Sequence, residues 1–95
     1  MQIIELKFDE EDDRLVGFEY GQKVYNEQVR DIIDLFSTDP IVVCFPKNII
    51  KVSSSFVQGF FEDVIHTIGY IGFEKRIIIS SRSETLSKYI RKLIW

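Results

Sequence analysis

Apolar and polar residues change their spacing several times along the 95-residue chain, and the spacing predicts the order of its strands and helices. Residues 2–8 alternate between apolar and polar positions, which is the period of a strand with one buried face. The acidic run at residues 9–13 suits a solvated hairpin tip. Residues 15–20 then predict a second strand, ended by Gly21. We therefore expect the chain to begin with a β-hairpin.

A helical spacing of apolar residues begins after Val24 and predicts the first helix. Its buried face comprises Tyr25, Val29, Ile32, Ile33 and Phe36. Asn26 is the expected N-cap. Pro40 marks the end, because proline disfavours helical geometry in the residue before it. The start of this helix stays open, since residues 22–25 could instead extend the second strand.

Two runs of β-branched residues, at 41–45 and 77–79, predict buried strands. Continuous apolar runs of this kind are typical of strands that helices cover on both faces. An amphipathic helix follows each run. The first of these ends at Gly69, with the apolar positions Val57, Phe60, Phe61, Val64, Ile65 and Ile68. The last helix starts with the capping-box pair Ser81 and Glu84 and has the inner face Leu86, Tyr89, Ile90, Leu93 and Ile94.

The predicted order is β-β-α-β-α-β-α. Strand–helix–strand units with right-handed connections give an α/β fold, here a small mixed β-sheet with helices and at least one parallel pair. The chain shows no internal repeat, linker or low-complexity segment. We expect residues 1–95 to form a single domain.

Composition narrows the class of protein. Hydrophobic residues make up 45% of the chain and charged residues 28%, the balance of a folded globular protein. Cys44 is the only cysteine, so an intrachain disulfide is excluded and a reducing compartment is expected. No apolar stretch reaches the length of a membrane span, and the N-terminal residues lack a signal-peptide pattern. We expect a cytoplasmic protein with no membrane partner.

The net charge of −3 conceals an asymmetry along the chain. Residues 1–39 carry 4 basic and 11 acidic side chains, a net charge of −7, whereas residues 40–95 carry 8 basic and 4 acidic ones, a net charge of +4. Such polarity can steer a charged partner or favour head-to-tail association. The simpler interpretation is a solvated turn and one charged helix face.

The most informative segment is the triple serine, Ser53, Ser54 and Ser55, before the second helix. Ser55 and Gln58 have capping-box spacing, so Ser55 is the expected structural cap. Ser53 and Ser54 would then lie beside the free amides and the positive dipole end of that helix, where a phosphate is well tolerated. A phosphate would add about −1.5 to −2 charges and alter a protein contact. The alternative is that all three serines only satisfy turn and cap hydrogen bonds.

The predicted order, with a buried strand, a short link and the helix start Val52-Ser-Ser-Ser-Phe56, resembles the STAS superfamily. That superfamily includes the anti-anti-sigma factors and a STAS-like family of unknown function, and the triple serine followed by phenylalanine is similar to the latter. In anti-anti-sigma factors the matching turn reads Asp-Ser-Ser-Gly, and a partner kinase of the histidine-kinase ATPase fold phosphorylates a serine there. The resemblance covers nearly the whole chain as topology and residues 49–61 as motif.

The resemblance implies a non-enzymatic signalling or regulatory module that docks a protein partner through the serine turn. Aligned on the apolar positions of the second helix, the phosphorylated serine corresponds to Ser54, and a shift of one residue makes it Ser53. No aspartate precedes the serine pair, since Val52 or Ser53 holds its place, so docking is implied more directly than phosphorylation. The implied partner is a histidine-kinase-type ATPase acting as a serine kinase. The expected partner-facing residues are Gln58, Glu62 and Asp63.

Enzyme chemistry is not expected. A nucleophilic pair would need Cys44, in a predicted central strand, to be exposed near His66, the only histidine. No Gly-x-Ser-x-Gly elbow or phosphate-binding glycine loop occurs. Zinc would need more ligands than one cysteine and one histidine. We therefore expect no catalytic residues, no metal and no cofactor.

An alternative function is nucleic-acid association through the basic C-terminal third, because phosphate contacts need clustered cations. The residues concerned are Lys75, Arg76, Arg82, Lys88, Arg91 and Lys92. The overall pI of about 5.1 speaks against this alternative, and cations near a helix C-terminus also offset the helix dipole.

Overall fold

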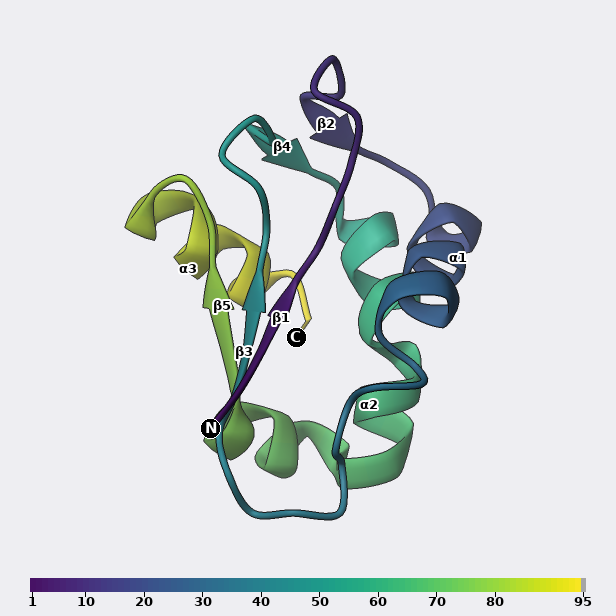
Figure 1. The fold of residues 1–95 in the computed structure, drawn as a ribbon, viewed down its shortest axis with the longest axis vertical. Helices are drawn as coiled ribbons and strands as arrows, with labels where there is room; N and C mark the ends of the chain where they lie inside the picture. The colour runs from purple at the N-terminus through teal and green to yellow at the C-terminus, as the bar shows by residue number, and fades with distance from the viewer. Residues whose placement is uncertain (95) are drawn as a thin grey trace.

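A computed structural model describes residues 1–94, which form short strands and three helices in chain order (Figure 1). The elements are β1 (Gln2–Glu5), β2 (Arg14–Leu15), α1 (Phe18–Gln28), β3 (Ile41–Cys44), β4 (Lys51–Val52), α2 (Ser54–Arg76), β5 (Ile77–Ser80) and α3 (Glu84–Lys92). The predicted α/β class is confirmed, and the order differs from the prediction by the added strand β4.

The strands form two sheets. The larger has the order β1-β3-β5, and the smaller pairs β2 with β4. All the pairs found within residues 1–94 are parallel, so the predicted mixed sheet and its opening hairpin are wrong. The acidic loop after β1 does not turn back on that strand. Its Asp9 and Asp12 carbonyls accept hydrogen bonds from the Asn48 side chain at 3.1 and 2.7 Å, which directs β2 towards β4.

The first helix begins earlier than predicted. The segment 15–20 was expected to be a strand, yet helix α1 starts at Phe18, and Asn26 lies inside it rather than at its N-cap. Gly17 holds the N-cap position with a φ of 108°, which favours glycine. Aromatic residues alternating with polar ones gave the strand pattern, but packing against α2 overrides this local preference.

The predicted inner face of the first helix is consequently shifted. Tyr25 and Val29 are buried as expected. The chain leaves helix α1 after Gln28, however, and Phe36 is 96% exposed. Ile32 is also exposed, because the residues after α1 form a surface loop rather than another two turns of helix.

The two predicted buried strands are confirmed at β3 and β5, and β3 is the central strand of the larger sheet. The prediction that helices cover both faces of these strands is wrong. The apolar core comprises one sheet face together with residues from all three helices. The opposite face leaves Ile3 and Ile78 exposed. The chain crosses from β1 to β3 through α1 and from β3 to β5 through α2. Both crossovers have the same hand and step in the same direction across the sheet, so they place the two helices on the same face.

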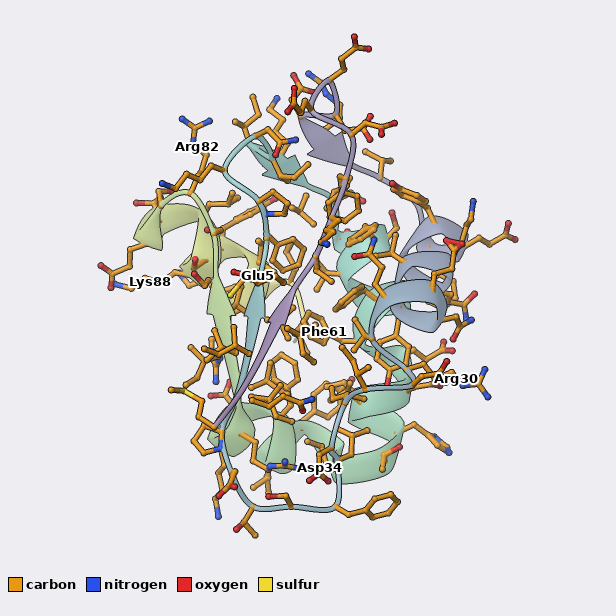
Figure 2. All side chains as sticks on the ribbon, in the orientation of Figure 1. Glu5, Arg30, Asp34, Phe61, Arg82 and Lys88 are labelled. Atoms are coloured by element: carbon orange, nitrogen blue, oxygen red, sulfur yellow. The ribbon has the colours of Figure 1, made fainter. Side chains whose placement is uncertain are left out.

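Aromatic side chains of α2 fill the core between the sheet and the helices. Phe60 packs on Phe61 with ring centroids 4.7 Å apart, and Phe61 packs edge-on against Phe73 at 5.0 Å. In Figure 2 the labelled Phe61 lies between the sheet and α2, whereas the labelled Glu5 lies on the side of the sheet away from α2. Rings in such tilted contact add to the stability that burial alone provides.

Two helix boundaries also differ from the prediction. Gly69 was expected to end the second helix; its φ of 73° interrupts the helix there, and helical backbone resumes as far as Arg76. The last helix is capped by Ser83 rather than Ser81, with the Ser83 hydroxyl accepting from the Leu86 amide at 3.1 Å. The Ser81 hydroxyl instead donates to the Ser83 carbonyl, which tightens the turn before α3.

Candidate docking site at the serine turn

The serine turn lies where β4 passes directly into α2. Ser53 is the N-cap, with extended backbone at φ −78° and ψ 157°, and its hydroxyl accepts from the Phe56 amide at 3.1 Å. The prediction that Ser55 is the N-cap is therefore wrong. The Ser53 amide donates to the Leu15 carbonyl at 2.8 Å, which fixes the strand end and starts the helix two residues earlier than the capping-box spacing indicated.

The Ser53 hydroxyl is engaged on several sides. Besides the Phe56 amide, the Gly17 amide donates to it at 3.4 Å, and the Ser55 hydroxyl lies 2.9 Å away. It joins the starts of α1 and α2 and is half-buried. This is the environment of a structural residue.

Ser54 differs from its two neighbours. It is exposed at the first position of α2, and its side chain makes no hydrogen bond with any residue that the structure describes. Ser55 is half-buried and contacts Ser53. Of the three serines, Ser54 is thus the one presented to a partner, and it lies at the helix end where amides lack intrahelical acceptors.

An apolar recess of about 420 Å³ lies beside Ser53, between the serine turn and α3. It is lined by Arg14, Val16, Ile50, Lys51, Val52, Ser53, Leu86 and Tyr89. Three of its apolar side chains reach solvent, with exposed fractions of 60% for Val16, 41% for Ile50 and 52% for Tyr89. Arg14 and Lys51 add positive charge to the rim. We call this set of lining residues the turn recess.

The turn recess was not foreseen from the sequence. Val16 was assigned to the longer second strand, and Tyr89 was expected on the inner face of the last helix, where the structure instead leaves it half exposed. A signal was nevertheless present, since Ile50 and Lys51 lie just ahead of Val52 and the serines, and Lys51 suits no buried strand. The pairing of β2 with β4 and the approach of α3 create the recess, and both are long-range contacts.

The predicted partner-facing residues divide between two sides of α2. Gln58 and Glu62 follow Ser54 at successive four-residue steps, so the three share one helix face, and Gln58 and Glu62 line a second recess of about 500 Å³. Asp63 is exposed and lines a smaller recess with Arg30 of the loop after α1, a recess that Glu62 lines as well. The structure thus brings Gln58 and Glu62, but not Asp63, onto the face of Ser54.

The candidate nucleophiles lie apart. Cys44 is half-buried on the sheet face that the helices leave open, whereas His66 belongs to α2, on the opposite side of the sheet. Burial and, to a lesser extent, the Glu5 carboxylate raise the pKa of the Cys44 thiol, and a hydrogen bond with Ser80 lowers it in part. A raised pKa keeps the thiol protonated and poorly nucleophilic at neutral pH. Within residues 1–94, no group of three or more histidine, cysteine, aspartate or glutamate side chains is placed so that it could hold a metal ion.

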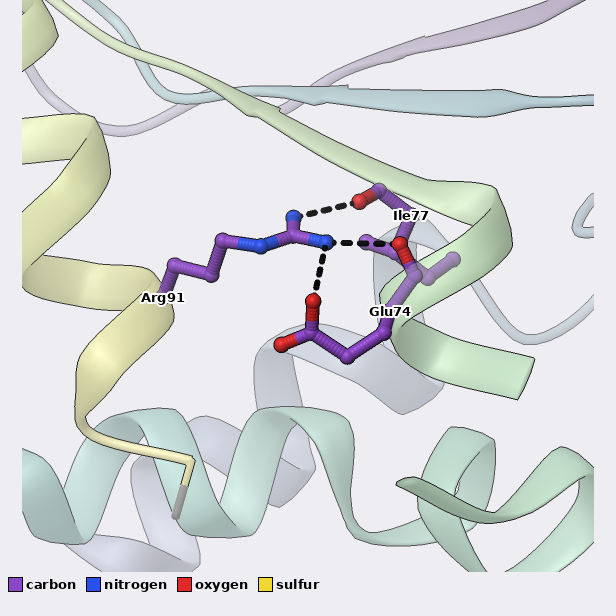
Figure 3. A network of polar contacts seen from close by, with 3 residues as sticks. All are labelled: Glu74, Ile77 and Arg91. Atoms are coloured by element: carbon purple, nitrogen blue, oxygen red, sulfur yellow. Dashed lines mark hydrogen bonds and ion pairs between the residues drawn. The ribbon is translucent and has the colours of Figure 1, made fainter. Parts of the chain in front are cut away.

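Some of the basic residues proposed for nucleic-acid contact have internal roles. Arg76 donates to the carbonyls of Leu35 and Asp34 at 2.9 and 2.7 Å. Arg91 donates to the carbonyls of Ile77 and Glu74 at 2.6 and 2.8 Å and reaches the Glu74 carboxylate at 3.4 Å (Figure 3). These two guanidinium groups hold backbone together.

No protein-family model matches the chain, and no curated protein or solved structure is significantly similar to it. No helix in residues 1–94 combines the length and apolar character that crossing a membrane requires.

Proposed function

We propose that this chain is a non-enzymatic regulatory module of STAS-like type that docks a protein partner at the serine turn. The observation that carries the proposal is an exposed, unengaged Ser54 hydroxyl that directly follows Ser53, a lining residue of the turn recess. Exposed apolar side chains gathered in a recess with a polar rim are typical of protein–protein contact sites.

Regulation by phosphorylation would act at Ser54. The Ser53 hydroxyl holds three contacts that a phosphate would break, whereas Ser54 is open to a kinase. A phosphate on Ser54 would stand at the positive end of the α2 dipole, next to the turn recess, and would change the charge that a partner meets. By resemblance, the kinase would be a histidine-kinase-type ATPase.

The experiment compares single charge insertions in one binding assay. The partner is first captured from native lysate with the wild-type chain and purified, and its affinity is then measured by titration calorimetry against Tyr89→Glu, Ile50→Glu and Ser54→Glu. Phe36→Glu is the matched control, because Phe36 is an exposed apolar side chain on the loop after α1.

We expect the two recess variants to weaken binding at least tenfold, since each places a charge in the apolar contact, and the control to leave it unchanged. Ser54→Glu should change the affinity in the same assay. Equal affinities for all four variants would remove the serine turn as the docking point. Mass spectrometry of the chain after incubation with the partner and ATP tests phosphate on Ser54 separately.

A further inference from the structure

The charge of the turn recess limits what can occupy it. Of its eight lining residues, Arg14 and Lys51 are basic and none is acidic. The other lining side chains are apolar, apart from the hydroxyl groups of Ser53 and Tyr89. An apolar recess with charge of one sign at its rim is complementary to an apolar group that carries the opposite charge beside it.

Arg14 and Lys51 are also neighbours in the smaller sheet. They are partners in the register of β2 with β4, so their side chains stand side by side on the same face of the two strands. Like charges directly opposite each other across two strands are destabilising. A negative group placed between the two cations would remove this repulsion, so the arrangement favours an anionic occupant.

The acidic residues of the chain do not supply that negative group. Asp13 contacts Arg14 at 3.2 Å, but both side chains are more than half exposed, and exposed pairs of this kind contribute little to stability. Lys51 forms no ion pair with any residue from 1 to 94. The other four acids of the loop at residues 9–13 do not line the recess. A partner carboxylate can therefore bind Lys51 directly and take the place of Asp13 at Arg14.

We infer that the occupant of the turn recess is an acidic segment of a partner protein. One large apolar side chain of this segment packs against Ile50 and Tyr89, and a carboxylate beside it binds Arg14 and Lys51. The recess of about 420 Å³ lies within the range of about 300–1,000 Å³ that ligand pockets have. The inference rests on the proposed function and names the chemistry of its partner.

The expected contact is weak and sensitive to salt. One apolar anchor and its flanking residues bury much less than the roughly 800 Å² per partner of a stable complex. Charge complementarity contributes chiefly to the choice of partner and to the rate of association. Because the two cations are exposed at the surface, salt screens their attraction for a carboxylate.

Three pools of short synthetic peptides test the chemistry of the occupant. Every peptide has a central leucine, phenylalanine or tryptophan. The flanking positions hold aspartate and glutamate in the acidic pool, lysine and arginine in the basic pool, and serine and glutamine in the neutral pool. Mass spectrometry measures how much of each pool the immobilised wild-type chain retains. We expect the acidic pool to be retained at least tenfold more than either of the others at low salt, and to be released as salt rises.

Variants of the chain locate the binding. Tyr89→Glu should abolish retention of the acidic pool, because it places a carboxylate in the recess. Lys51→Glu should remove the preference for that pool, because the glutamate then pairs with Arg14 across the strands. Lys23→Glu is the matched control, since Lys23 is an exposed lysine of α1 outside the recess, and it should leave retention unchanged. Circular dichroism of each variant verifies that it is folded.

The same variants test the repulsion between the two cations without any peptide. Lys51→Glu should raise the urea midpoint of unfolding relative to Lys23→Glu, because it replaces a repulsion across the strands with an attraction. The difference should shrink at high salt. A lower midpoint for Lys51→Glu than for Lys23→Glu would contradict the repulsion and overturn the inference.

The remaining outcomes separate this inference from the proposed function. If the neutral or basic pool is retained as well as the acidic one and Tyr89→Glu abolishes that retention, the recess is a docking site but its partner is not acidic. If no pool is retained, or if Tyr89→Glu leaves retention unchanged, the acidic segment is ruled out as the occupant. Docking itself is decided by the affinity of the captured partner for the recess variants, whatever the peptides show.

Discussion

A Cβ atom on Gly59 would stand 2.0 Å from the carbonyl oxygen of Phe18, so α1 and α2 meet through their backbones at this point. The contact is reciprocal, because a Cβ on Gly21 would stand 2.2 Å from the Phe56 carbonyl. The crossing holds the start of α1 against the start of α2, where Gly17 donates to Ser53. The position of the serine turn thus depends on two glycines outside it.

Gly59→Ala should therefore destabilise the chain. Inside a helix, alanine is more favourable than glycine by about 1 kcal/mol. The added methyl group, however, has no space against the α1 backbone, and such overpacking costs about 1–3 kcal/mol. We expect a net loss in the free energy of unfolding, measured by urea denaturation. Gln58→Ala, an exposed neighbour on the same helix, should change it by less than about 0.5 kcal/mol. A stabilised Gly59→Ala would contradict the close contact.

The hydrogen bonds of the serine turn predict unequal costs for removing its hydroxyls. Ser53→Ala should lower the free energy of unfolding by about 1–2 kcal/mol, since it removes the N-cap of α2. Ser54→Ala should change it by less than about 0.5 kcal/mol, as expected for an exposed surface position. Urea denaturation of Ser53→Ala, Ser54→Ala and Ser55→Ala shows which substitution lowers the free energy of unfolding most. A larger loss for Ser55→Ala than for Ser53→Ala would restore Ser55 as the cap.

Arg91 should contribute more to stability than a surface cation. It donates to two backbone carbonyls and lies over the Phe73 ring at 5.6 Å, and hydrogen bonds that involve a charged group are worth about 1.5–3 kcal/mol. Arg91→Ala should lower the free energy of unfolding, measured by urea denaturation, by that amount. Arg91→Lys should recover little of the loss, because lysine lacks the planar guanidinium group that donates to both carbonyls. Lys88→Ala is the control, since its pair with Glu84 is solvent-exposed and worth little.

The pKa of the Cys44 thiol is raised chiefly by burial and then by Glu5. Its alkylation rate should therefore reach half its maximum at a pH above the ordinary thiol range. Glu5→Gln should move that midpoint down, since it removes a negative charge that opposes the thiolate. Ser80→Ala should move it up, since it removes a hydrogen bond that favours the thiolate. The rate of alkylation by iodoacetamide over a pH series gives the midpoint for the wild type, Glu5→Gln and Ser80→Ala. A higher midpoint in Glu5→Gln would contradict the contribution of the Glu5 carboxylate to the raised pKa.

The same shift has a consequence for stability. The folded-state pKa of Cys44 lies above that of the unfolded chain, so the unfolded thiol ionises first as the pH rises. The contribution of the protonated Cys44 thiol to the free energy of unfolding is complete at pH values below the ordinary thiol pKa. It is lost as the pH rises through the pKa that the thiol has in the folded chain. Cys44→Ser should therefore show a shallower alkaline decline in the free energy of unfolding than the wild type.

The parts of the fold that the sequence predicts are those with strong local signals. β3 and β5 appear as continuous β-branched runs, and the break at Gly69 follows from glycine itself. The start of α1 was missed because the packing of Gly21 and Gly59, thirty-eight residues apart, decides it. Similarly, the motif located the serine turn, but the cap moved to Ser53 because a bond to Leu15, in a distant strand, ends β4. Contacts between remote segments leave little trace in local spacing.

A negative charge at Ser54 should stabilise the helix that it begins. Ser54 is the first residue of α2, and an acidic group at a helix N-terminus gains about 0.3–1 kcal/mol from the dipole. Ser54→Glu should raise the free energy of unfolding by that amount at low salt and by less at high salt, where the interaction is screened. Ser53→Glu should instead lower it, because the cap is lost. Thr67→Glu adds the same charge to an exposed position just before the break at Gly69, where the dipole offers no gain, so it serves as the control. If Ser54→Glu and Thr67→Glu had equal effects, the α2 dipole would not act at Ser54, and a phosphate there would change partner contact without reinforcing the helix.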